Sequence, residues 1–163
     1  MAATPVLDIL KQAYVLEHQG KKLYETARDA AKDSKVAAFF QDLADEEAHH
    51  MTLLETQMKA VTAQGKFRPP DLGDGDPQEI LDPELKERIN TAGFEATAIT
   101  AAIAFEERAV KTYSKHAQEA RDPEEKKLYH WLATWEKTHL KKLLSLQESL
   151  FQRIWSDNSF WPF

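Results

Sequence analysis

The sequence predicts an all-α protein, a four-helix bundle with a long crossover between the second and third helices and an aromatic C-terminal tail. Good helix formers are plentiful, whereas only 5 Gly and 7 Pro occur among 163 residues. Apolar residues recur at alternating spacings of three and four in four segments, which is the pattern of a helix with one buried face. The last two of these segments repeat the first two at an offset of 89 residues.

The first predicted helix starts at Thr4, which we interpret as an N-cap followed by Pro5 at the first helical position. Its apolar face includes a Glu and a Tyr among small and aliphatic residues: Leu10, Ala13, Glu17, Gly20, Tyr24, Ala27 and Ala31. Asp33 and Ser34 interrupt this helix and begin the second. The face of the second helix again contains polar residues at core positions: Phe40, Leu43, Glu47, His50, Leu54, Gln57 and Val61.

A segment rich in Gly, Pro and Asp follows, from Gly65 to about Thr91. Tight connections between antiparallel helices need only ~2–8 residues. The longer segment therefore predicts a crossover that lets the third helix start at the same end of the bundle as the second. Asp82-Pro83-Glu84 predicts a short helix within it, ending near Asn90. We interpret residues 1–163 as one domain with repeated halves, 1–64 and 91–155, because each half alone would hold half of a site.

The third helix is predicted from about Thr91 to Ala120, and its buried face contains Ile99, Ala102, Glu106, Ala109, Tyr113 and His116. Asp122 and Pro123 predict the N-cap and first residue of the fourth helix. Its buried face contains Tyr129, Leu132, Glu136, His139, Leu143, Leu146 and Leu150. The tail, residues 156–163, is rich in aromatic residues and is expected to cover a groove of this bundle or of a partner.

The polar residues on these faces form a repeated set. Glu47 and His50 are three residues apart, as are Glu136 and His139, so that each pair lies on one side of its helix. Two such pairs and two further Glu form the ligand set of a carboxylate-bridged two-metal site in a helix bundle. The predicted ligands are Glu17 and His50 for one metal, Glu106 and His139 for the other, with Glu47 and Glu136 bridging both.

Charge balance supports this interpretation. Four buried carboxylates would repel one another and lose hydration, whereas two divalent cations would neutralise them. Oxygen-rich ligation with one imidazole per metal favours iron or manganese over zinc. Tyr24 and Tyr113 lie seven residues beyond Glu17 and Glu106 on the same faces, so we expect them to support the site by hydrogen bonding to the ligand carboxylates.

Other residues of ligand type receive simpler interpretations. Glu46 and His49 have the same spacing as Glu47 and His50, but only the latter pair matches Glu136 and His139 in the repeat. Charged groups outside the buried faces are interpreted as solvated: Glu46, Glu107, Glu124 and Glu125. The remaining histidines are expected at the surface or behind the ligands: His18, His116 and His130.

Composition excludes several classes of function. The formal net charge is −6 and basic residues do not cluster, which argues against nucleic-acid binding. No segment approaches the ~20 apolar residues that span a bilayer, and the N-terminus lacks the features of a signal peptide, so a cytoplasmic location without membrane partners is expected. With no Cys, the chain has no disulfide and no thiolate metal site.

Four segments of this sequence resemble the ferritin-like superfamily, and in particular its rubrerythrin-related branch. They are residues 15–24, 43–50, 103–113 and 135–139, and with their helices they cover the chain from about Thr4 to Leu150. The resemblance implies two iron ions, with manganese as an alternative. Rubrerythrins typically have a further Glu three residues after the third-helix ligand, where this chain has Ala109, and a Cys-rich rubredoxin module that this sequence lacks. The six-residue set looks more like the symmetric site of bacterioferritin.

The resemblance implies a non-haem di-iron oxidoreductase of the peroxidase or ferroxidase type, which reduces H2O2 or O2 with oxidation of Fe(II) and protects against oxidative stress. Its reductant would be an external electron-donor protein, and a homodimer is expected. One alternative is a subunit of a ferritin-like iron-storage cage. Another is a structural bundle that acts through its aromatic tail.

Overall fold

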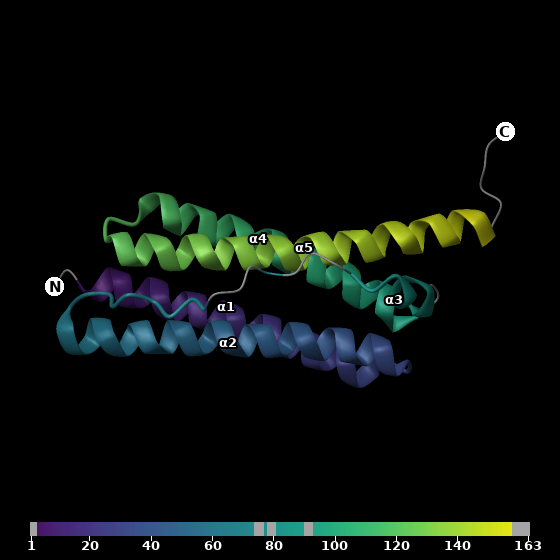
Figure 1. Cartoon of the computed structure of the whole chain (residues 1–163), viewed down its shortest axis with the longest axis horizontal. Coiled ribbons are helices and arrows are strands. Elements are labelled where there is room, and N and C mark those ends of the chain that lie inside the picture. The colour runs from purple at the N-terminus through teal and green to yellow at the C-terminus, as the bar shows by residue number, and fades with distance from the viewer. Residues whose placement is uncertain (1–2, 74–76, 78–80, 90–92, 158–163) are drawn as a thin grey trace.

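The computed structural model describes residues 3–73, 77, 81–89 and 93–157 of the chain. Four long helices form two layers: α1 (Ala3–Ala30) packs along α2 (Ser34–Gln64), and α4 (Phe94–Glu119) packs along α5 (Pro123–Asp157) (Figure 1). The short helix α3 (Pro83–Arg88) lies in the connection between the layers. Because α2 and α4 both begin at the end of the bundle where α3 lies, the predicted four-helix bundle with a crossover is confirmed.

Short polar side chains cap the helices at the predicted positions. Asp33 accepts hydrogen bonds from the backbone N–H groups of Lys35 and Val36 at the start of α2, at 2.8 and 3.3 Å. Asp122 accepts one from Glu124 at the start of α5, at 2.8 Å. Each cap satisfies backbone donors that the first turn of a helix leaves unpaired. The second helix of each antiparallel hairpin thus begins with an Asp cap.

Two predicted boundaries differ from the structure. The first helix begins at Ala3, so Thr4 is not its N-cap; Pro5 is tolerated inside the helix because N–H groups of the first turn have no helical acceptor. The third long helix begins at Phe94 after the N-cap Gly93, rather than near Thr91. Residue 91 and the predicted aromatic tail beyond residue 157 lie outside the described residues.

The crossover is attached to the bundle by specific hydrogen bonds. The buried amide of Gln57 on α2 donates to the backbone oxygen of Arg68 and accepts from its N–H, both at 3.1 Å. This exchange explains a polar residue at a core position, because each buried amide group has a partner. At the other end, Arg153 of α5 donates to the backbone oxygen of Ile89 at 2.6 Å. The long connection therefore has defined positions on both α2 and α5.

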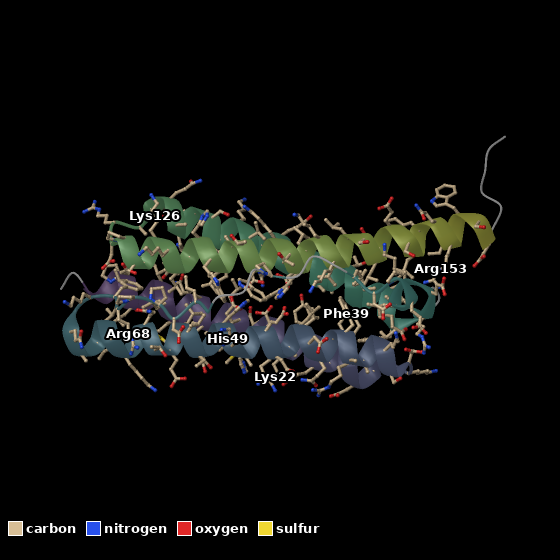
Figure 2. All side chains as sticks on the ribbon, in the orientation of Figure 1. Lys22, Phe39, His49, Arg68, Lys126 and Arg153 are labelled. Atoms are coloured by element: carbon tan, nitrogen blue, oxygen red, sulfur yellow. The ribbon has the colours of Figure 1, made fainter. Side chains whose placement is uncertain are left out.

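Two apolar clusters fill the bundle interior, one on each side of a polar layer. The α3-end cluster includes Phe40, Leu43, Ile99, Leu143 and Leu146, all nearly inaccessible to solvent. The N-terminal-end cluster includes Leu10, Leu54, Leu128, Tyr129 and Leu132. Long charged side chains such as Lys22 and Lys126 extend outward from the bundle (Figure 2). Every residue of the four predicted faces is buried except Ala31 and His116, which are half-buried.

One glycine permits a close approach between the layers. A Cβ atom at Gly20 of α1 would lie 2.7 Å from Cε1 of Phe105 on α4 and 3.4 Å from Cδ of Glu47. The first distance is shorter than any normal carbon–carbon contact, so either the Phe105 ring or the helix would have to move. Gly20 therefore allows α1, α2 and α4 to meet tightly beside the polar layer.

We expect Gly20→Ala to destabilise the protein by about 1 kcal/mol or more, the usual cost of overpacking. In open space the same change would stabilise a helix by about 1 kcal/mol. Urea denaturation measures the difference, with the exposed neighbour Gln19→Ala as the control. A Gly20→Ala protein more stable than the wild type would show that the Phe105 ring can move aside without destabilising the fold.

Candidate metal centre

All six predicted ligand residues meet in the polar layer between the two apolar clusters. Each of the four long helices contributes to it, and every one of the six residues is at most 1% exposed: Glu17, Glu47, His50, Glu106, Glu136 and His139. The helical period explains this meeting, because in each helix the carboxylate occupies one turn of an otherwise apolar buried face. Carboxylates are rarely found at such depth without a partner.

The six side chains form two groups of donor atoms that share two residues. One group consists of Glu17, Glu47, His50 and Glu136, and the other of Glu47, Glu106, Glu136 and His139. Within each group the donor atoms lie within 4.8 Å of one another, a separation that one cation can bridge. Glu47 and Glu136 belong to both groups, which is the arrangement predicted for bridging carboxylates.

Both imidazoles direct Nδ1 toward the carboxylates. His50 Nδ1 lies 3.0 Å from Glu17 Oε2 and 3.1 Å from Glu136 Oε1. His139 Nδ1 lies 3.1 Å from Glu136 Oε2 and 3.3 Å from Glu106 Oε1. The two rings are nearly parallel, with centroids 5.9 Å apart. Each ring thus presents one nitrogen to one group of carboxylate oxygens.

The two predicted supporting tyrosines connect the layers crosswise. The Tyr24 hydroxyl on α1 donates to Glu106 Oε1 on α4, and the Tyr113 hydroxyl on α4 donates to Glu17 Oε1 on α1. Both tyrosines are fully buried. Tyr113 and His50 contact different oxygens of Glu17, whereas Tyr24 and His139 both approach Oε1 of Glu106.

Several polar atoms of the layer lack a hydrogen-bond partner among the described residues. They are both carboxylate oxygens of Glu47 and of Glu136, Glu106 Oε2, His50 Nε2 and His139 Nδ1. Leaving one buried polar atom unsatisfied costs about 1–3 kcal/mol, and more for a charged group. Most of these atoms belong to the two donor groups. Hard oxygen donors with one imidazole each fit divalent iron or manganese, so the residues present suit a pair of such ions.

The titration behaviour also indicates a site built for cations. Burial, together with the charges of Glu136 and Glu47, raises the pKa of Glu17, and burial and Glu136 likewise raise the pKa of Glu106. Burial lowers the pKa of His139, but the carboxylates around it outweigh burial and raise it overall; the same holds for His50. Without cations, protons therefore neutralise part of this layer.

Two acidic residues interpreted as solvated are partly or wholly withdrawn from solvent. Glu46 accepts a hydrogen bond from His139 Nε2 at 2.5 Å, so it supports the site from behind the imidazole. Glu125 is only 7% exposed. The chain contains many Glu at similar helical positions, and nothing in the sequence distinguishes Glu46 from them. The alternative ligand His49 is exposed and packs its ring near Trp131, away from the carboxylates.

Comparisons with known proteins agree with this architecture. A family model described as Rubrerythrin matches residues 8–147. Among solved structures, a dodecameric thioferritin, the bacterioferritin-related protein from Bacteroides fragilis, aligns with 98% of this chain and 92% of its own. The TM-score is 0.65 at 18% sequence identity, which shows a shared ferritin-like fold. No curated protein matches the chain. None of the described helices is long and apolar enough to cross a membrane.

We expect metal binding to release protons. In the metal-free protein, Glu17, Glu106 and both imidazoles keep protons to higher pH than usual because each has a raised pKa. A cation must displace these protons, so affinity should rise with pH and fall on acidification. Calorimetric titration with Mn(II) in buffers of different ionisation enthalpy measures the number released. Binding that neither releases protons nor depends on pH would contradict this description of the layer.

We expect Glu17→Gln to change the stability of the metal-free protein little but to remove most of the stabilisation by metal. Because the raised pKa of Glu17 favours its protonated form, the isosteric amide should change metal-free stability at pH 7 by no more than about 1 kcal/mol. The same variant should lose most of the increase in melting temperature that Mn(II) gives the wild type, since the amide is a weaker ligand. Thermal denaturation with and without Mn(II) measures both effects. An equal increase in both proteins would exclude Glu17 as a ligand.

Proposed function

Because the chain belongs to the rubrerythrin family, we propose that it is a non-haem di-iron oxidoreductase that reduces H2O2 or O2 and oxidises Fe(II). The observation that carries the proposal is the pair of four-residue donor groups that share Glu47 and Glu136. One cation in each group would place the two cations close together, because both groups include Glu47 and Glu136. A pair of adjacent redox metals is what a two-electron reduction of an oxidant needs.

Each residue of the layer has a defined task in this proposal. Glu17 and His50 would hold one iron, Glu106 and His139 would hold the other, and Glu47 and Glu136 would be shared between them. The bound iron pair would supply the two electrons for the oxidant. Tyr24 and Tyr113 hold the terminal carboxylates in place through their hydroxyl groups. The apolar clusters on both sides exclude water, so that the charges of the site act in a medium of low dielectric constant. Manganese is the alternative metal.

The electrons for further turnover would come from another protein. The sequence contains no Cys, so it includes no thiolate centre that could deliver them. An external electron-donor protein therefore belongs to the proposal. We also propose a homodimer and a cytoplasmic location.

Iron storage is a second candidate function. The structural neighbour from Bacteroides fragilis is described as a dodecameric thioferritin, and a closed assembly of that kind is what a storage protein needs. In a cage, oxidation at the same site would precede deposition of iron. The size of the assembly in solution therefore separates the two candidates. A third candidate, a structural bundle acting through its aromatic tail, requires no metal at all.

The proposed activity predicts loss on removal of a shared carboxylate. The protein is loaded anaerobically with Fe(II), its metal content is measured, and absorbance is followed after addition of H2O2 or O2. We expect two irons per chain and rapid oxidation for the wild type. Glu47→Ala and Glu136→Ala should slow oxidation by about 100-fold or more, beyond the usual range for changes behind the ligands.

Glu55→Ala is the matched control, because Glu55 lies on the same helix as Glu47 but forms an exposed ion pair with Lys59. It should oxidise iron like the wild type. Full activity of Glu47→Ala and Glu136→Ala would exclude this site. Light scattering that finds a large closed assembly instead of a dimer would favour storage. Absence of bound metal after reconstitution, with an unchanged melting temperature, would favour the structural bundle.

A further inference from the structure

The residues behind the two imidazoles break the symmetry of the repeat. At the offset of 89 residues, Glu46 corresponds to Trp135 and Asp42 corresponds to Trp131. The ligands themselves correspond without exception, Glu for Glu and His for His. Two successive turns thus have acidic residues on α2 where α5 has indoles. The inference drawn from this difference rests on the proposed metal site.

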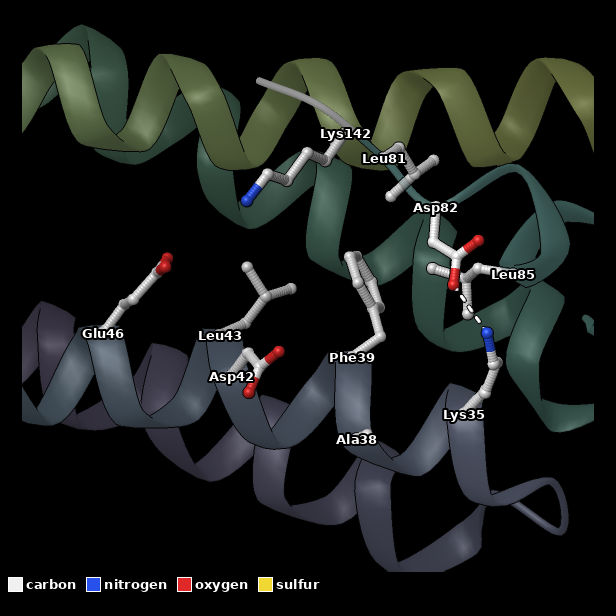
Figure 3. A pocket seen from close by; sticks show the side chains of 10 residues that line it. All are labelled: Lys35, Ala38, Phe39, Asp42, Leu43, Glu46, Leu81, Asp82, Leu85 and Lys142. Atoms are coloured by element: carbon white, nitrogen blue, oxygen red, sulfur yellow. Dashed lines mark hydrogen bonds and ion pairs between the residues drawn. The ribbon is translucent and has the colours of Figure 1, made fainter. Parts of the chain in front are cut away.

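On the acidic side, His139 is connected to an open pocket. Its Nε2 donates to Glu46 Oε2 at 2.5 Å, and the Glu46 side chain is 30% exposed. Glu46 and Asp42 line one wall of a pocket of about 280 Å³ between α2 and α5, with Lys142 on the opposite wall (Figure 3). Phe39 and Leu43 contribute the apolar part of the same lining. A charged acceptor accessible to water therefore lies directly behind this imidazole.

On the aromatic side, His50 has no such acceptor. Its ring packs edge-on against Trp131 and Trp135, with centroids 5.4 and 5.9 Å away. Among the described residues, neither His50 Nε2 nor the indole Nε1 of Trp135 has a hydrogen-bond partner, although both atoms are buried. Among the described residues, no side chain therefore accepts a hydrogen bond from the nitrogen of His50 that faces away from the carboxylates, and aromatic rings pack against this side of the imidazole.

A carboxylate behind a ligating imidazole strengthens metal binding in three ways. It fixes the tautomer, so that the lone pair of Nδ1 points to the metal, and it increases the electron density on the ring. It also restricts ring rotation, which lowers the entropy lost on binding. Only His139 has this support.

We propose that the two metal positions are unequal, that the position of Glu106 and His139 binds its ion more tightly, and that Glu46 is the positioning residue responsible. The position of Glu17 and His50 then exchanges its ion more readily. Two chemically equal ligand sets thus become two functionally different ones through the residues that precede each Glu-x-x-His pair.

Anaerobic calorimetric titration with Mn(II) tests the proposal without any redox chemistry. Glu46→Ala should weaken the tighter binding step by about 10–100-fold, the range for changes behind metal ligands. Glu46→Gln should have a smaller effect, because the amide oxygen still accepts a hydrogen bond but carries no charge. Asp42→Asn is the matched control, since it removes an acid from the same pocket wall without touching His139. It should change both affinities by less than about fivefold, as expected for an exposed charge.

Single-histidine backgrounds assign the effect to one position. In His50→Ala, which keeps the supported imidazole, Glu46→Ala should again weaken binding by about 10–100-fold. In His139→Ala it should have no further effect, because its partner is gone. Equal losses in the two backgrounds, no loss in the otherwise wild-type protein, or an equal loss with Asp42→Asn would each overturn the proposal. Absence of any Mn(II) or Fe(II) binding by the wild type would refute the proposed function itself, whereas two bound ions unaffected by Glu46→Ala would refute only the inequality.

Discussion

The electrostatic cost of four carboxylates inside an apolar bundle dominates this structure. Glu17, Glu47, Glu106 and Glu136 lie in one layer with almost no access to water. Isolated charges at such depth would cost several kcal/mol each. The rest of the layer reduces this cost: two imidazoles face the carboxylates, and two phenols donate to them. Protons or divalent cations complete the neutralisation, which couples the ionisation of the layer to metal binding.

The apolar clusters on either side make the layer a site. They hold the four helices at a fixed spacing, and they keep water away from donor atoms that remain without partners. The crosswise tyrosines illustrate how this rigidity is used, because Tyr24 belongs to the α3-end cluster and reaches the carboxylate of the opposite helix. Close packing at Gly20 likewise restricts Glu47, because the carboxyl carbon of Glu47 lies next to this glycine. The buried polar layer thus destabilises the fold and the apolar clusters stabilise it, as is usual for functional sites.

The 89-residue repeat accounts for the symmetry of the ligands, but it does not extend to the residues behind them. The two halves contribute equal donor sets because each carries one Glu and one Glu-x-x-His pair. The residues that immediately precede Glu47 and Glu136 differ. Glu46 accepts a hydrogen bond from His139 on the opposite helix, whereas the indole of Trp135 packs against His50. A centre of this kind can keep one ion firmly while the other responds to its surroundings.

The sequence alone was sufficient to predict the bundle, the crossover and the convergence of the six residues. The reason is that helical periodicity is local: a Glu at the spacing of Leu and Ala must lie on the buried face with them. Even the division into two donor groups follows from the repeat. Family membership agrees with this prediction, and the six residues form two groups that could each hold a metal ion. The start of α1 at Ala3 was not predicted, because helix starts that differ by one or two residues have similar free energies.

Only the tertiary structure decided what lies behind the ligands. Glu46 is one of many helical Glu in this chain, and its contact with His139 depends on how α2 faces α5, two helices far apart in the sequence. The burial of Glu125 and the exchange between Gln57 and the crossover are likewise set by the packing of distant segments. Periodicity assigns a residue to a face of its own helix, but the partner across the interface is determined by helix spacing and rotation, which no local pattern encodes.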